Sequence, residues 1–323
     1  MIIVFKFELI SYFCRYNNQN FESMGSIGIQ KTAFRIAAWG LLMVMLPFIG
    51  YSQSKRAFMV GISNYSSNQG NSKGWNDIHG ENDVNLLAPT LKKQGFTIQK
   101  LCNKEATANN IRKTLTSFSE KCKSGDVIYL QFSCHGQPFE DYDGDESDGW
   151  DEALVPFDAL KEYQQGKYSG ENHITDDELN SYLKIIRNRV GPKGFVYVVI
   201  DACHAGDSYR GGEDEDSVVI RGTGKGFSKS NKQYAPRLDK RRKIKVEKSA
   251  NMSNICILEA CRSYQVNSEI RADGKYYGSL SYYVNKTLQS TKLDKSISWT
   301  ERVLKYITQD LRLQQDPVIE TSM

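Results

Sequence analysis

Two uninterrupted hydrophobic runs, each followed at once by polar residues, dominate the pattern along this chain. Residues 195–206 read FVYVVIDACHAG, and residues 126–137 read DVIYLQFSCHGQ. Apolar runs of this length, rich in β-branched and aromatic residues, predict strands that are buried on both faces, as the strands of a parallel sheet are. Both strands would end in polar loops, at the sheet edge where open α/β folds bind their ligands.

Further strands and helices alternate around these two runs. Strands are predicted over residues 56–63, 96–101, 152–156 and 254–260. Helices are predicted to begin at Glu81, at an N-capping Thr107 and at a capping box formed by Thr175 and Glu178; a fourth helix carries Leu280, Tyr283, Val284 and Leu288, and Ser298 with Glu301 caps a last one. Strands separated by helices imply right-handed crossovers. The predicted fold class is therefore α/β, with a mostly parallel central sheet flanked by helices.

Cys203 and His135 lie just beyond the ends of the two buried strands. Neighbouring parallel strands would bring them side by side, which is the arrangement that acyl-transfer cysteine enzymes use. In such enzymes the thiolate attacks a carbonyl carbon and the imidazolium protonates the leaving amine. His204 is a weaker partner for Cys203, because adjacent residues of extended backbone point to opposite sides. The other histidines, His79 and His173, are predicted to lie at the surface or in loops.

Composition sets few limits on function. The chain has 323 residues, of which 40% are hydrophobic, and this is enough for one large α/β domain or two small ones. The net charge of +4 and the pI near 8.5 are mild. We therefore expect no nucleic-acid partner.

Residues 1–52 are expected to form an N-terminal extension and a signal peptide outside the fold. A short basic region precedes an apolar run over residues 36–49, which is the pattern of a secretory signal cleaved near Ser52, and Met24 would be its start. The apolar run is short for a membrane span. We expect no span in the mature chain and an exported protein, periplasmic or secreted, with an uncleaved N-terminal anchor as the alternative.

The cysteines do not define a scaffold. Beyond Cys14, which falls in the N-terminal extension, six remain, and this even number in an exported protein would allow a disulfide. Their spacing matches no disulfide-dense fold. We expect mostly buried free thiols, with Cys134 pointing into the core.

Residues 140–152 carry eight carboxylates and no basic side chain. Such a density repels itself unless it is solvated or neutralised by a cation. Asp141, Asp143, Asp145 and Glu152 nearly match the calcium loop of an EF-hand, but a glutamate stands where that loop requires glycine. A true EF-hand is therefore not expected, and a solvated acidic loop stays open beside a cation site.

Regular periodicity disappears between residues 207 and 253. Residues 221–248 of this segment contain eleven Lys or Arg against two acidic residues. A segment of this length without secondary structure is either disordered or functional. We describe it as a flexible basic linker, and its charge could bind a polyanion.

The motifs SCHGQ around His135 and DACHAG around Cys203, in that order, resemble those of caspase-type cysteine peptidases, and metacaspases more than animal caspases. Asp201 replaces the glutamine of the caspase signature, a histidine follows the cysteine, and 68 residues separate the two motifs' key residues. The likeness extends over about residues 55–320, through KRAFMVGIS, ENDV and ACRSYQ. It implies a caspase-like three-layer fold that forms a single peptidase domain over residues 53–323.

The resemblance also implies a role for the residues at the strand ends. Cys203 would be the nucleophile and His135 the group that protonates the leaving amine, with no obligatory third member. The backbone amides of Gly136 and Cys203 would bind the oxyanion, and losing one such donor costs on the order of 10²-fold in rate.

The same resemblance implies a pocket for a basic side chain. Asp201 would receive an Arg or Lys that precedes the scissile bond, with Asp83 as its partner and Ser133 also binding substrate. A helix N-terminal charge is the alternative role for Asp83. Specificity for basic residues would make the linker over residues 207–253 a site of self-cleavage.

Calcium is the remaining implication of the resemblance. Asp151, Asp176 and Asp177 fall where calcium ligands of the family occur, although a capping Thr175 would make the last two ordinary first-turn residues. The chemistry would need no cofactor, and Ca²⁺ would act as an activator.

Competing functions remain at this stage. The first is a cysteine endopeptidase, monomeric, acting on proteins or peptides with Arg or Lys before the scissile bond. The alternative is a non-catalytic caspase-fold binding module that acts through the basic segment or the acidic loop. A metal hydrolase built on Cys134, His135, Cys203 and His204 would need ligands that the spacing does not provide.

Overall fold

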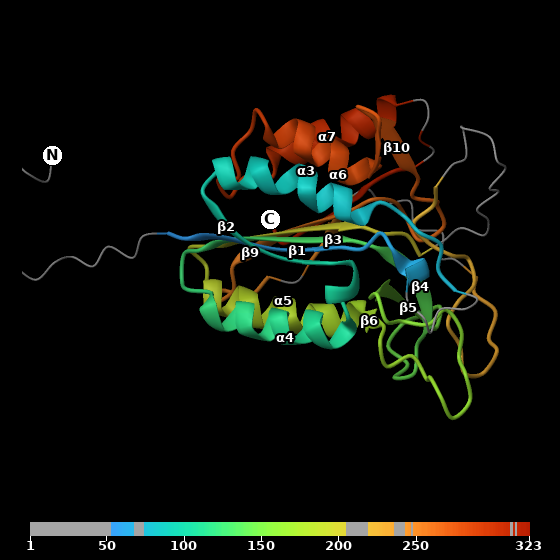
Figure 1. The fold of residues 1–323 in the computed structure, drawn as a ribbon. Helices are drawn as coiled ribbons and strands as arrows, with labels where there is room; N and C mark the ends of the chain where they lie inside the picture. Colours follow the sequence, from blue (N-terminus) through green and yellow to red (C-terminus); the bar gives the residue numbers. More distant parts are fainter. Residues whose placement is uncertain are drawn as a thin grey trace, which may run out of the picture. The chain divides into compact units, whose positions relative to one another are not determined.

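A seven-stranded sheet forms the centre of the described chain (Figure 1). The computed structural model describes residues 53–67, 74–204, 219–235, 243–246, 248–310, 313 and 315–323. The strands run in the order β2 (Phe96–Cys102), β1 (Lys55–Gly61), β3 (Val127–Ser133), β7 (Phe195–Asp201), β9 (Asn254–Glu259), β12 (Val318–Thr321) and β8 (Lys243–Lys245). All pairs from β2 to β9 are parallel, whereas β12 is antiparallel to β9 and parallel to β8. The sheet is thus mostly parallel, as predicted.

Helices cover both faces of this sheet. One face carries α3 (Gly80–Lys93), α6 (Ser279–Leu288) and α7 (Ser298–Gln309), and the other carries α4 (Ala108–Lys121) and α5 (Asp176–Val190) (Figure 1). Single 3-10 turns lie at Tyr65–Ser67 and Asn103–Glu105. Because β-strand side chains alternate between faces, the sheet buries two separate hydrophobic cores, one under each helical layer. The predicted three-layer α/β fold is confirmed.

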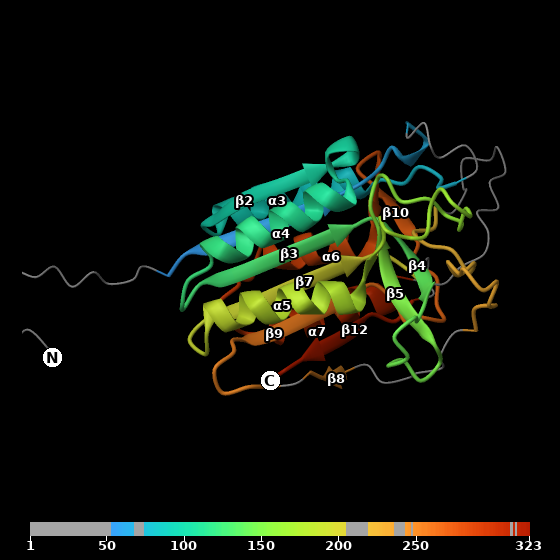
Figure 2. The same ribbon diagram turned by 90° about the horizontal axis from the view of Figure 1, so that it is seen from below.

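Two small antiparallel elements lie beyond the carboxyl ends of the parallel strands (Figure 2). One is the three-stranded sheet of β4 (His135–Glu140), β5 (Trp150–Val155) and β6 (Ile174–Thr175). The other is the hairpin of β10 (Glu269–Ala272) and β11 (Lys275–Gly278). These elements flank the edge of the central sheet at which β3 and β7, the two predicted buried strands, end.

The helix starts agree with the sequence at two of three predicted caps. Thr107 accepts a hydrogen bond from Asn110 N, and Thr175 accepts one from Glu178 N. The cap predicted at Ser298 is wrong. The N-cap of α7 is Ile297, which makes no side-chain capping bond, so Ser298 is already the first helical residue.

The remaining predictions concern the N-terminus, membrane spans and the cysteines. Residues 1–52, with the predicted signal peptide, lie outside the described residues. None of the helices in the described part of the chain combines the length and hydrophobicity that crossing a bilayer requires. Cys102 and the five buried cysteines beyond it are all free thiols, as expected.

Candidate active site

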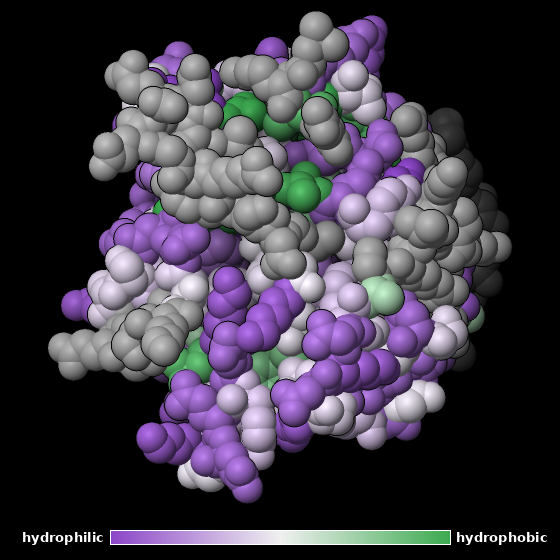
Figure 3. Space-filling view, turned by 90° about the vertical axis from the view of Figure 1, so that its right-hand side faces the viewer, coloured by the Kyte–Doolittle hydropathy of each residue, from purple (hydrophilic) through white to green (hydrophobic). Residues whose placement is uncertain are grey.

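The register of β3 and β7 brings the two predicted catalytic residues to one edge of the sheet. Ser133 lies opposite Asp201 in this parallel pair. His135 and Cys203 follow these partners by two residues each, so both leave the sheet at the same place. Figure 3 views the molecule from this side, where the described surface is mainly hydrophilic and hydrophobic residues show only in small patches.

His135 is held as a neutral imidazole with one basic nitrogen free. Its Nε2 lies 2.9 Å from the carbonyl oxygen of Asn76, which can only accept, so Nε2 carries the hydrogen. Nδ1 is buried and has no hydrogen-bond partner among the described residues. The ring packs between Tyr65 and Trp75, at centroid distances of 4.9 and 4.8 Å. Burial lowers the pKa of His135 to about 4, so Nδ1 is available as a base at neutral pH.

Cys203 is fully buried beside a second thiol. Its Sγ donates a 2.9 Å hydrogen bond to the carbonyl oxygen of Gln265, and Cys261 Sγ lies 3.5 Å away. Because a carbonyl only accepts, the bond to Gln265 describes a protonated thiol. The resting sulfur must therefore turn and lose its proton before it can act as a nucleophile.

Two backbone amides converge on a single oxygen next to this thiol. The N–H groups of Gly136 and Cys203 donate to the carbonyl oxygen of Arg221, at 3.1 and 3.0 Å. A Cβ at position 136 would lie 2.5 Å from the carbonyl oxygen of Cys203, so only glycine permits this approach of β4 to the segment after β7. These are the two amides expected to bind an oxyanion, and a linker carbonyl lies between them.

The residues before Arg221 bind the site as an added strand. Arg221 N donates to Asn267 O at 3.1 Å, and Glu269 N donates to Val219 O at 2.9 Å, with an antiparallel bridge between Ile220 and Ser268. This is the main-chain pairing by which an extended peptide extends a sheet edge. A three-residue stretch of the linker thus lies in the site as a peptide substrate would.

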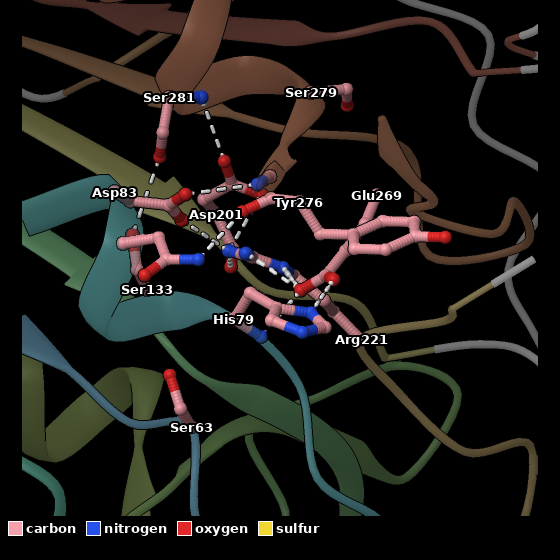
Figure 4. Close-up of polar contacts among 12 residues, drawn as sticks. Ser63, His79, Asp83, Ser133, Asp201, Arg221, Glu269, Tyr276, Ser279 and Ser281 are labelled. Carbon is pink, nitrogen blue, oxygen red and sulfur yellow. Dashed lines mark hydrogen bonds and ion pairs between the residues drawn. The ribbon is translucent and has the colours of Figure 1, made fainter. Parts of the chain in front are cut away.

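The side chain of Arg221 fills a closed pocket of carboxylates (Figure 4). The guanidinium is fully buried. Its Nη1 lies 2.5 Å from Asp83 Oδ2 and 3.5 Å from Asp201 Oδ1, and its Nε and Nη2 donate to Glu269 Oε1 at 3.0 and 2.9 Å. The structure therefore places Asp83 and Asp201 together, as predicted, and adds Glu269.

The two predicted carboxylates are fixed by further donors. Asp83 Oδ1 accepts from Gly278 N at 2.9 Å, while Asp201 accepts from Asn267 Nδ2 and from Ser281 N, both at 2.7 Å. Burial raises the pKa of Asp83 to about 6, although Arg221 opposes the shift. The pocket is therefore preorganised to bind a buried cation.

Ser133 lies beside this pocket with its hydroxyl already engaged. Its Oγ accepts from Gln131 Nε2 at 2.9 Å and lies 3.3 Å from Ser281 Oγ. Ser281 in turn donates its backbone N–H to Asp201. Ser133 thus contacts the network that holds Asp201, and the predicted role in substrate binding stays a prediction.

Sequence reasoning missed two residues of the site. Arg221 was visible only as the first of eleven basic residues in a segment without periodicity. Glu269 gave no signal, because a single glutamate in a loop-like stretch is ordinary. Their pairing joins positions 48 residues apart, so it is a property of the tertiary structure.

The acidic loop forms two overlapping groups of carboxylates. Asp145 belongs to both: with Asp141 and Asp151 in one, and with Asp143 and Asp177 in the other, the oxygens in each lying within 4.8 Å of one another. Asp151 is 7% exposed, and its Oδ1 has no partner among the described residues. Hard oxygen ligands with an unsatisfied buried oxygen fit a calcium ion.

The third predicted calcium ligand lies elsewhere. Asp176 belongs to neither group and lines a cavity with Glu152, Glu259 and Glu320. Burial raises the pKa of Asp176 to about 7, with the neighbouring Asp151 adding to the shift. Asp151 and Asp177 thus each belong to one carboxylate group, and Asp145 belongs to both, whereas Asp176 belongs to neither; calcium binding stays a prediction.

His173 lies in a loop, which is one of the two predicted locations, but it is buried there. Its ring packs against Phe139 and Phe227, its Nδ1 lies 2.9 Å from Tyr168 Oη, and its Nε2 lies 2.9 Å from Gln137 Oε1. Burial lowers its pKa to about 3. His173 thus packs against Phe227 of the linker, and no hydrogen bond joins it to Cys203 among the described residues. His79, in contrast, is half-buried and binds Glu269.

Comparison with known proteins agrees with this architecture. The family model Peptidase_C14, described as a caspase domain, matches residues 54–323. Metacaspase-2 of Arabidopsis thaliana is 34% identical over 164 residues, which are 47% of this chain and 34% of that protein. Metacaspase-3 of the same plant is 36% identical over 163 residues, 47% of this chain and 40% of that protein. The chain therefore spans well under half the length of these curated relatives.

A solved structure shares the fold. Protein GSU0716 from Geobacter sulfurreducens superimposes with a TM-score of 0.53 and 18% sequence identity, covering 83% of this chain and 92% of that one. The fold, with a cysteine and a histidine following neighbouring strands at one sheet edge, is that of a caspase-like α/β protein. The chain belongs to the caspase-domain family of cysteine peptidases. Its similarity to metacaspases extends over 47% of its length.

Proposed function

We propose that this chain is a cysteine endopeptidase that cuts after basic residues and processes itself within its own linker. The observation that carries the proposal is the position of Arg221. Its carbonyl oxygen lies between two backbone amides beside Cys203, and its guanidinium fills a buried carboxylate pocket. A residue on the acyl side of a scissile bond needs both contacts. The following bond, Arg221–Gly222, is therefore the proposed site of self-cleavage.

The chemistry uses Cys203 and His135 as a dyad. The thiol turns from its present acceptor, gives its proton to Nδ1 of His135, and the sulfur attacks the carbonyl carbon of Arg221. The amides of Gly136 and Cys203 hold the oxyanion that forms. The imidazolium then protonates the amide nitrogen of Gly222 as the C–N bond breaks. Water hydrolyses the resulting thioester, with His135 accepting its proton.

Specificity for a basic residue follows from charge. Asp83 and Asp201 are buried in a pocket that, without a cation, would leave them desolvated and unpaired. A neutral or acidic side chain cannot relieve that cost, and truncating one partner of a buried ion pair typically costs about 2 to 5 kcal/mol. Substrates would therefore carry Arg or Lys before the scissile bond.

Mass spectrometry of the incubated full chain tests this proposal. We expect one fragment that ends at Arg221 and one that begins at Gly222 from the wild type, and neither from Cys203→Ala. A Val-Ile-Arg amide with a fluorogenic leaving group should be cleaved by the wild type only. Equal fragmentation of both proteins would remove Cys203 from the mechanism. A wild type that cleaves neither its linker nor the amide would favour the non-catalytic binding module.

Calcium is proposed to act through the loop over residues 140–152. Asp145, Asp151 and Asp177 would hold the ion, with Asp141 and Asp143 completing the two groups. Bound Ca²⁺ would neutralise mutually repelling carboxylates and order the loop; the peptide chemistry itself needs no metal.

The acidic loop also holds the linker on the leaving side of the proposed bond. Ser228 donates to Glu140 at 2.7 Å, Lys229 N donates to Tyr142 Oη at 3.0 Å, and Lys232 Nζ donates to Gly149 O at 2.7 Å. A change in the loop on binding a cation would therefore reach residues 228–232 directly. This contact is the route by which calcium would influence self-cleavage.

We also propose that the protein is exported after signal cleavage near Ser52 and that it is a monomer. The sequence pattern over residues 24–52 supports export. N-terminal sequencing of the protein recovered from outside the cytoplasm would test the first point, and an intact N-terminus there would contradict it.

A further inference from the structure

Glu269 contacts the part of Arg221 that distinguishes arginine from lysine. Its Oε1 accepts from Nε at 3.0 Å and from Nη2 at 2.9 Å, so one carboxylate oxygen spans the side of the guanidinium (Figure 4). Asp83 binds the opposite nitrogen, Nη1, at 2.5 Å. Glu269 and Asp83 therefore bind two different edges of the planar guanidinium.

Lysine cannot reproduce this pattern. Arginine presents five N–H donors in a rigid plane, whereas lysine ends in one ammonium and has a methylene where arginine has Nε. An ammonium placed to bond Asp83 leaves Glu269 without its donors, and one placed to bond Glu269 leaves Asp83 without its donor. In either position one buried carboxylate keeps its hydrogen bonds to the protein but loses those from the substrate side chain, and a site built to bond a substrate N–H rejects an analogue that lacks it.

Glu269 is fixed in this orientation by His79. The backbone N–H of His79 donates to Oε1 at 2.7 Å, and its ring Nδ1 lies 2.5 Å from Oε2. The ring is stacked on Tyr276 at a centroid distance of 5.0 Å. Although burial raises the pKa of Glu269, Arg221 and His79 outweigh it and keep the pKa below its usual value. The Glu269 side chain, with 0% of its surface exposed, is therefore a fixed anion.

The main chain of Glu269 aligns the peptide as well. Its N–H donates to the carbonyl oxygen of Val219, two residues before Arg221. The residue thus binds the backbone of the linker and the side chain of its basic residue at once. A substrate that is shifted along the strand would lose both contacts together.

We propose that Glu269, with His79 as its positioning residue, makes this pocket select arginine over lysine. The inference rests on the proposed function, in which the pocket around Arg221 receives the residue before the scissile bond. It goes further in naming the side chain that separates the two basic residues.

A two-by-two set of variants tests the inference within the full chain. Self-cleavage is timed for the wild type, Arg221→Lys, Glu269→Gln and the double variant. Hydrogen bonds to charged groups are worth about a ten- to hundredfold change in equilibrium or rate. We expect Arg221→Lys to slow cleavage by at least about tenfold when Glu269 is present, and by no more than about threefold when it is Gln. Equal slowing in both backgrounds would overturn the proposal.

Matched peptide amides give the second readout. Each enzyme form is assayed with Val-Ile-Arg and Val-Ile-Lys amides, and the ratio of the two kcat/KM values is compared. The ratio does not depend on how much of a variant is folded, so a loss of stability cannot imitate the result. Glu120→Gln, at an exposed position on α4, is the control and should keep the wild-type ratio.

His79 is tested by removal and by a conservative replacement. His79→Ala should lower the Arg-to-Lys ratio, and His79→Asn, whose side chain keeps an N–H near the position of Nδ1, should restore most of it. The proposed selectivity would be contradicted if Glu269→Gln kept the wild-type ratio, or if the wild type cleaved both amides equally. Neither result would contradict the proposed peptidase activity. A wild type that cleaves no bond would overturn both.

Discussion

The backbone N–H of Cys203 donates a 3.0 Å hydrogen bond to the carbonyl oxygen of Arg221. In the proposed mechanism, this bond places the chain's own linker where an external peptide would bind. The guanidinium of the same residue closes the carboxylate pocket, so both subsites are occupied together. In the proposed mechanism, self-cleavage must therefore precede activity on any other protein.

Replacing Arg221 by alanine should destabilise the fold. The substitution leaves Asp83, Asp201 and Glu269 buried without their cation, and breaking a buried pair from one side costs about 3 to 5 kcal/mol. Urea unfolding in a Cys203→Ala background measures this without cleavage. Arg302→Ala, at an exposed position on α7, is the matched control and should change stability by less than about 0.5 kcal/mol. Equal stability of the two variants would mean that Arg221 does not neutralise the pocket.

Replacing Gly222 by alanine should slow self-cleavage. A Cβ at this position would lie 2.2 Å from the carbonyl oxygen of Cys203 and 2.8 Å from its carbonyl carbon, and backbone atoms cannot move aside as a flexible side chain can. The displaced scissile carbonyl would lose alignment with its amides, and a misplacement of about 1 Å can cost on the order of 10²-fold in rate. Gel time courses measure the effect. Lys225→Ala, three residues on in a solvent-exposed ion pair, should cleave at the wild-type rate, and cleavage of Gly222→Ala at that same rate would place the scissile bond elsewhere.

Cleavage after arginine should weaken as the pH falls through about 6. Burial raises the pKa of Asp83 to about 6 with Arg221 in place, and protonation below that value removes the anion that binds Nη1. Because Arg221 lowers this pKa, the vacated pocket titrates at a higher pH. His135 does not set the acid limb, since burial brings its pKa to about 4.

The pH profile of kcat/KM for an arginine amide checks this assignment. The wild type should show an acid limb at or above pH 6. Asp83→Asn should have lower activity and lack that limb, because it has no charge to lose. An acid limb that persists unchanged in Asp83→Asn would assign the titration to another group.

The strand ends could be read from the sequence because their signals are local. The apolar runs before Asp201 and Ser133 fix two buried strands, and the parallel pairing of such strands places His135 and Cys203 at one edge. Asp83 was assigned to the pocket through the family resemblance, because its position at a helix start alone indicates only a helix N-terminal charge. The sequence and its family resemblance therefore pointed to residues that the structure brings close to Arg221, whereas their catalytic and substrate-binding roles stay predictions.

The remaining features depend on contacts between distant segments. Glu269 and Arg221 have no periodic neighbours, and their roles appear only when residues 219–221 pair beside β10. The burial of His173 in its loop had no sequence signal either, because the aromatic rings that pack on it come from β4 and the linker. The carboxylate groups contain Asp145 and not Asp176. The acidic loop has no periodicity in sequence, so only its fold shows which carboxylates lie together.

Removing calcium should slow self-cleavage, and Asp145 should matter most for the effect. Asp145 is the one carboxylate shared by both groups of the described acidic loop, so Asp145→Asn weakens every proposed arrangement of ligands at once. The loop binds residues 228–232, which follow the proposed scissile bond in the chain, so its disorder would loosen the leaving side of the substrate.

Calorimetric titration of Ca²⁺ into Cys203→Ala, which cannot cleave itself, measures binding apart from activity. We expect binding in this protein and a loss of at least about tenfold in affinity with Asp145→Asn added, because calcium affinity follows the number of charged ligands. Asp294→Asn, at an exposed position outside the loop, removes the same charge and should bind as before. Self-cleavage of the corresponding Cys203-containing chains, timed with and without a chelator, links binding to function. If Ca²⁺ binds but the chelator does not change the rate of self-cleavage, the ion has a structural role only. If no heat of binding is measured, the acidic loop binds no Ca²⁺ and its carboxylates are solvated.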